Sequence, residues 1–244
     1  EGTTTPTALR LSPTTALEFA PDGNLWAVSF DDNELLWINP ALTGVVDRFE
    51  LPGGAELTSA TRVGSERIAL ADELGRLRVM NLATGRQSPP TSLHGGPVVG
   101  VAATADGRFV ASIGADGTLA MLRVTDDGLE QRALVDASQA GARPTALAFT
   151  ADGTYLITGD LAGSVQSWRV ADLAVPAAPG TPQAGLAEVS ASVHTAPVRQ
   201  VESFAQSGFA TTGLDGTVRI WSAAPLRPID GADLPLVVPF QIVA

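Results

Sequence analysis

Apolar and polar residues alternate in short runs along most of the chain, and turn-forming residues separate the runs. The clearest stretch extends from His194 to Trp221, where the runs VRQVESF, FATTG and TVRIW are separated by QSG and LDG. Alternation with a period of two, broken by Gly and Asp, predicts antiparallel β-strands. The pattern therefore predicts an all-β chain.

The strand pattern also repeats. An Asp-Gly turn follows an apolar run at Asp22, Asp106 and Asp152, and a degenerate copy with the turn Gly64-Ser65 lies between the first two. The spacing corresponds to a period of about 42–46 residues, which is long enough for four short strands and their turns. Five repeats are predicted, at about residues 14–52, 53–92, 93–138, 139–192 and 193–222.

Polar residues recur at fixed places in these repeats. Each of the two histidines has Val at the fourth and seventh positions after it, and a Ser or Thr and an Asp follow at similar spacing. In the last repeat alone, a Trp completes the set. The set comprises His194, Thr211, Asp215 and Trp221 in the last repeat and His94, Ser112 and Asp116 in the third. This set resembles the WD40 repeat, in which His, Ser/Thr, Asp and Trp hydrogen-bond to one another inside a propeller blade.

The resemblance implies a WD40-like β-propeller of five four-stranded antiparallel blades, in one domain over residues 1–244. An N-terminal strand at about residues 6–12 is expected to complete the last blade, as is common in this family. The Pro- and Ala-rich part of repeat 139–192 predicts a surface insertion of about ten residues. The tail, residues 223–244, is long enough for a sixth, partial blade or leads toward a further segment.

The same polar set has a second interpretation, since a hydroxyl, a His and an Asp can form a catalytic triad. The spacing places Thr211 inside a strand, whereas a nucleophile needs an exposed position beside an oxyanion hole. We therefore interpret these residues as a structural hydrogen-bond network and expect no catalytic residues.

Composition excludes several other classes of site. The chain has no Cys, its net charge is -11, and all 15 basic residues are Arg. Thiolate chemistry and a Lys-containing phosphate loop are therefore excluded, and nucleic acid is an unexpected partner. The acidic turns lack the ligand spacing of a calcium loop, so no metal and no cofactor are expected. No apolar run reaches the roughly 20 residues of a membrane helix, and the compartment stays open.

The resemblance implies a non-catalytic scaffold that binds a protein or peptide on a propeller rim or at the channel mouth, as a monomer or within a larger assembly. Arginines on or beside strands are candidates for anchoring an acidic partner: Arg62, Arg76, Arg78, Arg199 and Arg219. One alternative is a propeller with a small-molecule or catalytic site in its channel. Another is a soluble part of a larger, membrane-attached protein, because residue 1 is Glu and the chain reads as processed or excerpted.

Overall fold

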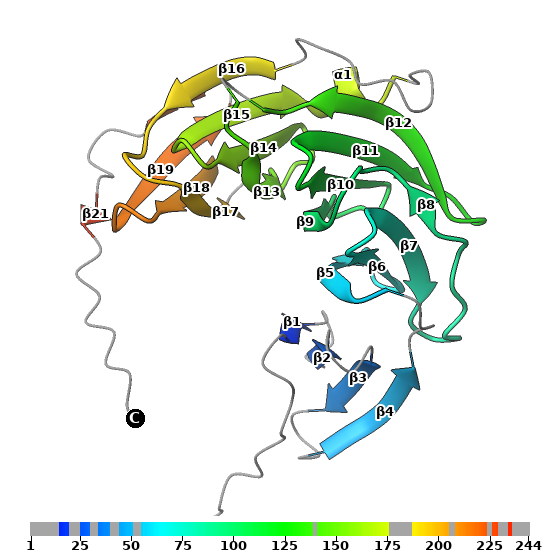
Figure 1. Ribbon diagram of the computed structural model, residues 1–244. Helices are drawn as coiled ribbons and strands as arrows, with labels where there is room; N and C mark the ends of the chain where they lie inside the picture. The colour runs from blue at the N-terminus through cyan, green and yellow to red at the C-terminus, as the bar shows by residue number, and fades with distance from the viewer. Residues whose placement is uncertain are drawn as a thin grey trace, which may run out of the picture.

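The chain folds into antiparallel β-sheets arranged one after another around a common centre (Figure 1). The computed structural model describes residues 15–19, 25–29, 34–39, 44–50, 55–138, 141–175, 187–204, 208–223, 226–228 and 234–235. Within these ranges there are five sheets, and in each the strands pair in the order of the chain. The prediction of an all-β chain built from four-stranded antiparallel sheets is confirmed.

Each sheet is formed by one continuous part of the chain. The first sheet comprises β1 (Thr15–Phe19), β2 (Leu25–Ser29), β3 (Glu34–Asn39) and β4 (Gly44–Glu50). The second comprises β5 (Leu57–Val63), β6 (Arg67–Asp72), β7 (Arg76–Asn81) and the short β8 (Thr91–Ser92). The third comprises β9 (Val98–Ala103), β10 (Phe109–Gly114), β11 (Thr118–Val124) and β12 (Leu129–Asp136).

The last two sheets follow the same plan. The fourth comprises β13 (Pro144–Phe149), β14 (Tyr155–Asp160), β15 (Ser164–Arg169) and β16 (Ala187–Ser192). A one-turn helix, α1 (Val170–Leu173), follows β15 and begins the region where the insertion was expected. Residues 176–186 of that insertion lie outside the described residues.

The fifth sheet comprises β17 (Val198–Phe204), β18 (Gly208–Gly213), β19 (Thr217–Ala223) and β20 (Leu226–Pro228). A further short strand, β21 (Leu234–Pro235), pairs with the start of β19, on residues 217–218. The tail thus pairs with β19 through two short strands. Residues 6–12, for which we predicted a place in this last blade, lie outside the described residues.

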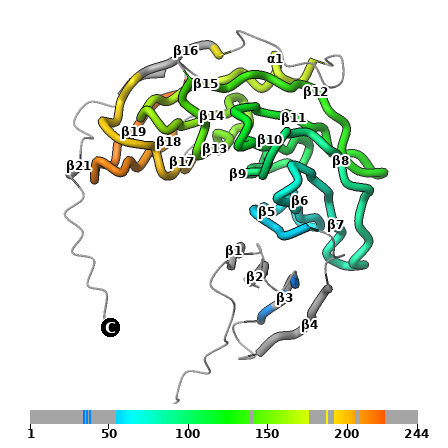
Figure 2. The backbone as a smooth tube through the Cα atoms, viewed as in Figure 1, coloured from blue at the N-terminus to red at the C-terminus, as the bar shows by residue number. Residues whose placement is uncertain are grey.

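The first strand of each sheet is innermost and the fourth is outermost, as the second to fourth sheets in Figure 2 show. Neighbouring sheets pack face to face, and alternate residues of each strand face opposite neighbours. Leu156 and Trp168 of the fourth sheet pack against the third sheet, whereas Ile157 and Val165 pack against the fifth. Within the second to fifth sheets, this alternation places the largest apolar side chains between the sheets and builds a separate core at each interface.

The tryptophans of the last two repeats lie in these interfaces. Trp221 is 1% exposed and stacks on Phe209, with ring centroids 6.1 Å apart and an interplanar angle of 12°. Trp168 occupies the corresponding place in the fourth sheet. A buried Trp removes about 150–250 Å² of surface from water, so each anchors its sheet to the preceding one.

Candidate functional site

The turns between the second and third strands of the sheets lie at one end of the molecule, which we call the turn rim. In the second to fifth sheets it consists of residues 72–75, 114–117, 160–163 and 213–216. Each turn ends on a Gly with φ between 76° and 89°, a conformation that residues with a Cβ adopt only at a cost. The rim therefore presents four turns of the same shape side by side.

In the fifth sheet, a chain of hydrogen bonds links the turn rim to the interior. The Trp221 Nε1–H donates to the Thr211 hydroxyl over 3.0 Å, and His194 Nε2 lies 2.8 Å from the same oxygen. His194 Nδ1 lies 3.1 Å from both Asp215 oxygens and from the Thr217 hydroxyl. Since a carboxylate only accepts, Nδ1 carries the proton and Thr211 donates to Nε2. The four predicted residues of the last repeat are thus in direct contact.

The third sheet contains a closely related histidine network. Ser112 donates to His94 Nε2 over 2.8 Å, and His94 Nδ1 lies 2.6 Å from the Thr118 hydroxyl. Thr118 in turn donates to Asp116 over 2.7 Å, and the Gly95 N–H donates to the other carboxylate oxygen. Here the His reaches the Asp through a hydroxyl, because Nδ1 lies 3.7 Å from the nearest Asp116 oxygen.

Burial and hydrogen bonding shift the pKa of one His and one Asp in these networks. Burial lowers the pKa of His94, and the nearby Asp116 carboxylate does not offset this, so His94 is neutral at pH 7. Burial alone would raise the pKa of Asp215, but hydrogen bonds from Thr217, Thr195 and His194 outweigh it and hold that pKa well below its usual range. A neutral His94 and an ionised Asp215 agree with the hydrogen bonds that these two groups make.

A catalytic use of these residues would need an accessible hydroxyl. Thr211 and Ser112 are both fully buried, and the Thr211 oxygen already contacts both Trp221 and His194. A substrate has no approach to either oxygen. The arrangement can fix strands and turns relative to one another.

The second and fourth sheets hold their turns differently, through an Asp at the last position of the second strand. Asp72 Oδ1 accepts the backbone N–H groups of Leu74 and Arg76, each over 3.0 Å. Asp160 Oδ1 accepts those of Ala162 and Ser164, each over 2.8 Å. We call this arrangement the aspartate turn. Sequence reasoning missed it.

A sequence signal for the aspartate turn does exist. The four-residue turns read DELG and DLAG in the second and fourth sheets, but GADG and GLDG in the third and fifth. A Cβ at Gly114 or Gly213 would overlap the His and Asp of the histidine network. An Asp at the first turn position and a histidine network are therefore mutually exclusive.

The two aspartate turns differ in their second carboxylate oxygen. Asp72 Oδ2 accepts from Arg76 Nε over 2.8 Å and lies 3.6 Å from the Arg78 guanidinium. Asp160 Oδ2 is buried and has no partner among the described residues. Ser164 and Gln166 follow Asp160 where the two arginines follow Asp72. Burial, which outweighs the backbone hydrogen bonds, raises the pKa of Asp160.

We expect Asp160→Asn to stabilise the protein at neutral pH. Because the pKa of Asp160 is raised on folding, its protonated form stabilises the fold below the unfolded pKa, about 3.9, and this contribution is lost as pH rises through the folded pKa. The amide keeps the Oδ1 acceptor and removes a buried charge, which is worth about 1–2 kcal/mol. Urea unfolding at pH 4 and pH 8 should show the gain at pH 8 only. Asp72→Asn should instead destabilise, because it removes the counter-charge of Arg76.

The five candidate arginines lie in different places. Arg76 and Arg78 contact Asp72, and Arg62 donates to the carbonyls of Gly64 and Ser65 at the end opposite the turn rim. Arg199 is exposed near the turn rim, at the start of β17. Arg219 is half-buried in β19, opposite Thr211, and its Nε is buried without a partner in the described part of the chain. The structure does not bring the five arginines together.

The turn rim exposes large apolar side chains at matching places. Leu74, Leu161 and Leu214 are 53%, 51% and 61% exposed, and each lies one or two residues before the Gly that ends its turn. Val99, the second residue of β9, is 42% exposed at the same end. A single exposed Leu needs no explanation, but an exposed Leu in the same turn of three sheets makes the rim a candidate contact surface.

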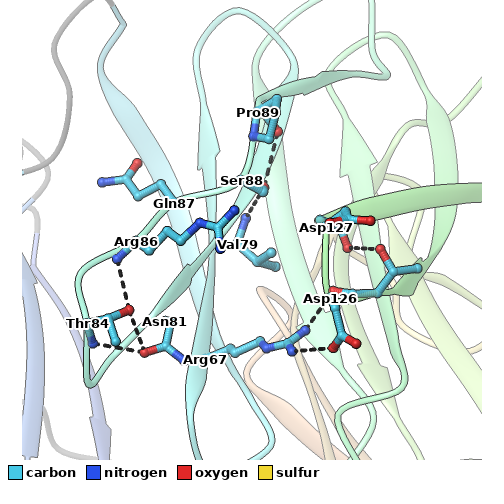
Figure 3. A pocket seen from close by; sticks show the side chains of 12 residues that line it. Arg67, Val79, Asn81, Thr84, Arg86, Gln87, Ser88, Pro89, Asp126 and Asp127 are labelled. Carbon is cyan, nitrogen blue, oxygen red and sulfur yellow. Dashed lines mark hydrogen bonds and ion pairs between the residues drawn. The ribbon is translucent and has the colours of Figure 1, made fainter.

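A crevice of about 360 Å³ lies between the outer parts of the second and third sheets, away from the turn rim (Figure 3). Arg67 crosses it and donates to the Thr125 carbonyl over 2.8 Å and to Asp126 over 3.2 Å. Arg86, Ser88 and other residues of the segment after β7 form one wall. Arg67 and Asp126, the charged groups that meet across the crevice, pair with each other. Their contact joins the second and third sheets.

The described residues also bear on metal sites and membrane-spanning helices. Within these residues, no three His, Asp or Glu side chains lie close enough to hold a metal ion. In the same residues, no helix has both the length and the apolarity needed to cross a membrane.

Comparison with known proteins agrees with this geometry. The WD40 family model, described as "WD domain, G-beta repeat", matches residues 188–222, which include the fifth-sheet histidine network. No curated protein matches the chain. The match to the family is thus confined to the repeat whose polar set is complete.

Solved structures share the fold at low sequence identity. The β-propeller domain of Myceliophteria thermophila Cps50 (Swd1) aligns with a TM-score of 0.72 and 13% identity, over 91% of this chain and 72% of that one. A chain of the Mitotic Checkpoint Complex aligns with a TM-score of 0.70 and 14% identity, over 87% of this chain and 61% of that one. The chain therefore has the β-propeller fold, and its residues 188–222 match the WD40 repeat model.

Proposed function

We propose that the protein is a non-catalytic scaffold that binds a protein or peptide partner on the turn rim. The observation that carries this proposal is the repeated exposure of Leu74, Leu161 and Leu214 at the same turn in three sheets. Apolar side chains held on rigid turns lose little conformational freedom on binding, so their burial contributes to affinity. One structure of similar fold is part of a multi-protein complex, which is consistent with this role.

The internal bonding of the turns supports the same role. Each described turn of the second to fifth sheets is fixed from below by a histidine network or an aspartate turn. The exposed leucines are therefore presented by a preorganised backbone. A preorganised surface suits recognition, whereas the polar residues beneath it are occupied with one another.

The experiment captures partners from lysate of the native organism with the whole chain, identifies them, and then measures affinity with purified proteins. The double variant Leu161→Ser/Leu214→Ser should weaken binding at least about tenfold, because two apolar anchors are lost. Val175→Ser is the matched control, since Val175 is 62% exposed but follows α1, away from the turn rim. Equal affinity of the leucine variant and the control would show that the rim is not the binding surface.

A further inference from the structure

We infer that the turn rim binds a partner segment with two oppositely charged halves, in one orientation. The basic half of the segment lies over the second and third sheets, and its acidic half over the fourth and fifth. This inference rests on the proposed function and adds the chemistry of the partner to it. It derives from the distribution of charge between the exposed leucines.

The second and third sheets make an acidic half of the rim. Its carboxylates are the exposed Glu56, Glu73 and Asp136 and the partly exposed Asp116, whose side chain is 26% exposed. Asp136 pairs across the strands with Thr118, directly after the third turn, so it lies at the rim. The pKa of Asp116 is lowered, because hydrogen bonds from Gly95 and Thr118 outweigh the effect of burial, so this carboxylate is ionised at neutral pH.

The arginine beside the turn of the second sheet is already paired with a carboxylate. Arg76 is the basic residue at the start of β7, and its guanidinium contacts the buried Asp72. Leu74 lies between these two residues in the sequence and projects from the same turn. A partner residue above Leu74 therefore meets an apolar surface within a field of negative charge, which favours Lys or Arg with an apolar neighbour.

The fourth and fifth sheets make a basic half. Arg143 and Arg199 are exposed there, and neither side chain has an ion pair or hydrogen bond within the described residues. The Leu161 N–H donates to the Arg143 carbonyl, so that Arg lies beside the fourth turn. The Leu214 N–H donates to the Pro197 carbonyl, two residues before Arg199.

The carboxylates of this half do not cancel its positive charge. Asp160 is 3% exposed and lies beneath its turn. The Asp215 side chain is 8% exposed and is bonded to His194, Thr195 and Thr217. Among the described residues beside the turns of this half, the exposed charges are therefore those of the two arginines, and they favour a carboxylate-bearing segment.

The probes are three fluorescent 14-residue peptides with the same leucines: one with Arg at one end and Glu at the other, one uniformly basic and one uniformly acidic. The two-ended peptide carries a photo-reactive group at its basic end. It should bind the whole chain about tenfold more tightly than either uniform peptide, and salt should weaken it. Cross-links should map to the second and third sheets.

Charge reversal tests orientation without changing net charge. The variant Glu73→Arg/Asp136→Arg/Arg143→Glu/Arg199→Glu should still bind the two-ended peptide, but cross-links should move to the fourth and fifth sheets. Arg143→Glu/Arg199→Glu alone should weaken that peptide about tenfold. The matched control is Glu66→Arg/Arg86→Glu, an exposed pair at the opposite end, which should change nothing.

Three outcomes would overturn the inference: a uniform peptide that binds as tightly, cross-links that stay in place after charge reversal, or no binding of the two-ended peptide to the unmodified chain. The leucine variants separate this failure from that of the proposed function. If they lose the natural partner while charge reversal does not, the rim is the binding surface and the two-ended charge is wrong.

Discussion

Replacing Thr211 with Val is expected to destabilise the protein by about 2–5 kcal/mol. Val keeps the branched shape but removes an oxygen that contacts two buried groups, Trp221 Nε1 and His194 Nε2. Each buried polar atom left without a partner costs about 1–3 kcal/mol. Urea unfolding followed by Trp fluorescence measures the loss.

The matched variant for this experiment is Thr158→Val in the fourth sheet. Thr158 is buried and accepts the Trp168 N–H over 2.9 Å, but no His contacts it among the described residues. Only one group is orphaned, so the cost should be about 1–3 kcal/mol. If both variants lose the same stability, His194 contributes nothing through Thr211 and the histidine network is not cooperative.

Gly163→Ala should be the second strongly destabilising change, at about 3 kcal/mol or more. Gly163 has φ of 81°, and a Cβ there would overlap the His194 and Ala196 carbonyl oxygens of the next sheet. The conformation itself costs Ala about 1–2 kcal/mol, and the overlap must in addition push two sheets apart. Thermal unfolding by circular dichroism measures the effect.

Gly216→Ala separates these two contributions. Gly216 ends the equivalent turn of the fifth sheet with φ of 76°, and a Cβ there would meet no atom of the described residues within 4 Å. The loss should be limited to about 1–2 kcal/mol of backbone strain. Equal losses at the two positions would mean that the turn of the fourth sheet does not pack tightly against the segment at His194.

The architecture was readable from the sequence because strand alternation and turn residues are local signals. Asp106 and Asp152 marked the turns between the first and second strands of the third and fourth sheets. The structure has a strand before and after each of these turns. The partners of His194 were predicted from the resemblance of their spacing to the WD40 repeat, and the structure brings them into contact. In each case the residue types and their separation along the chain carry the information.

Other features depend on contacts between distant parts of the chain. Asp72 and Asp160 occupy the turn position at which the third and fifth sheets have Gly. A comparison of the four turn sequences would therefore have revealed their roles. The strands β20 and β21 are too short to show alternation. The candidate arginines could not be sorted by sequence, because Arg76 and Arg199 differ only in whether a carboxylate lies within reach.

The mutual exclusion of the two turn arrangements limits how freely the repeats can be exchanged. Introducing Asp at Gly114 or Gly213 while the His is present creates an overlap, and removing the His first leaves Ser112 or Thr211 without its partner. Either single step is unfavourable, and only the paired change leads from one stable arrangement to the other. The four described turns of the second to fifth sheets are thus of two kinds, and every single-step intermediate between them is less stable than either. A chimaera must therefore exchange a turn together with the His segment beneath it.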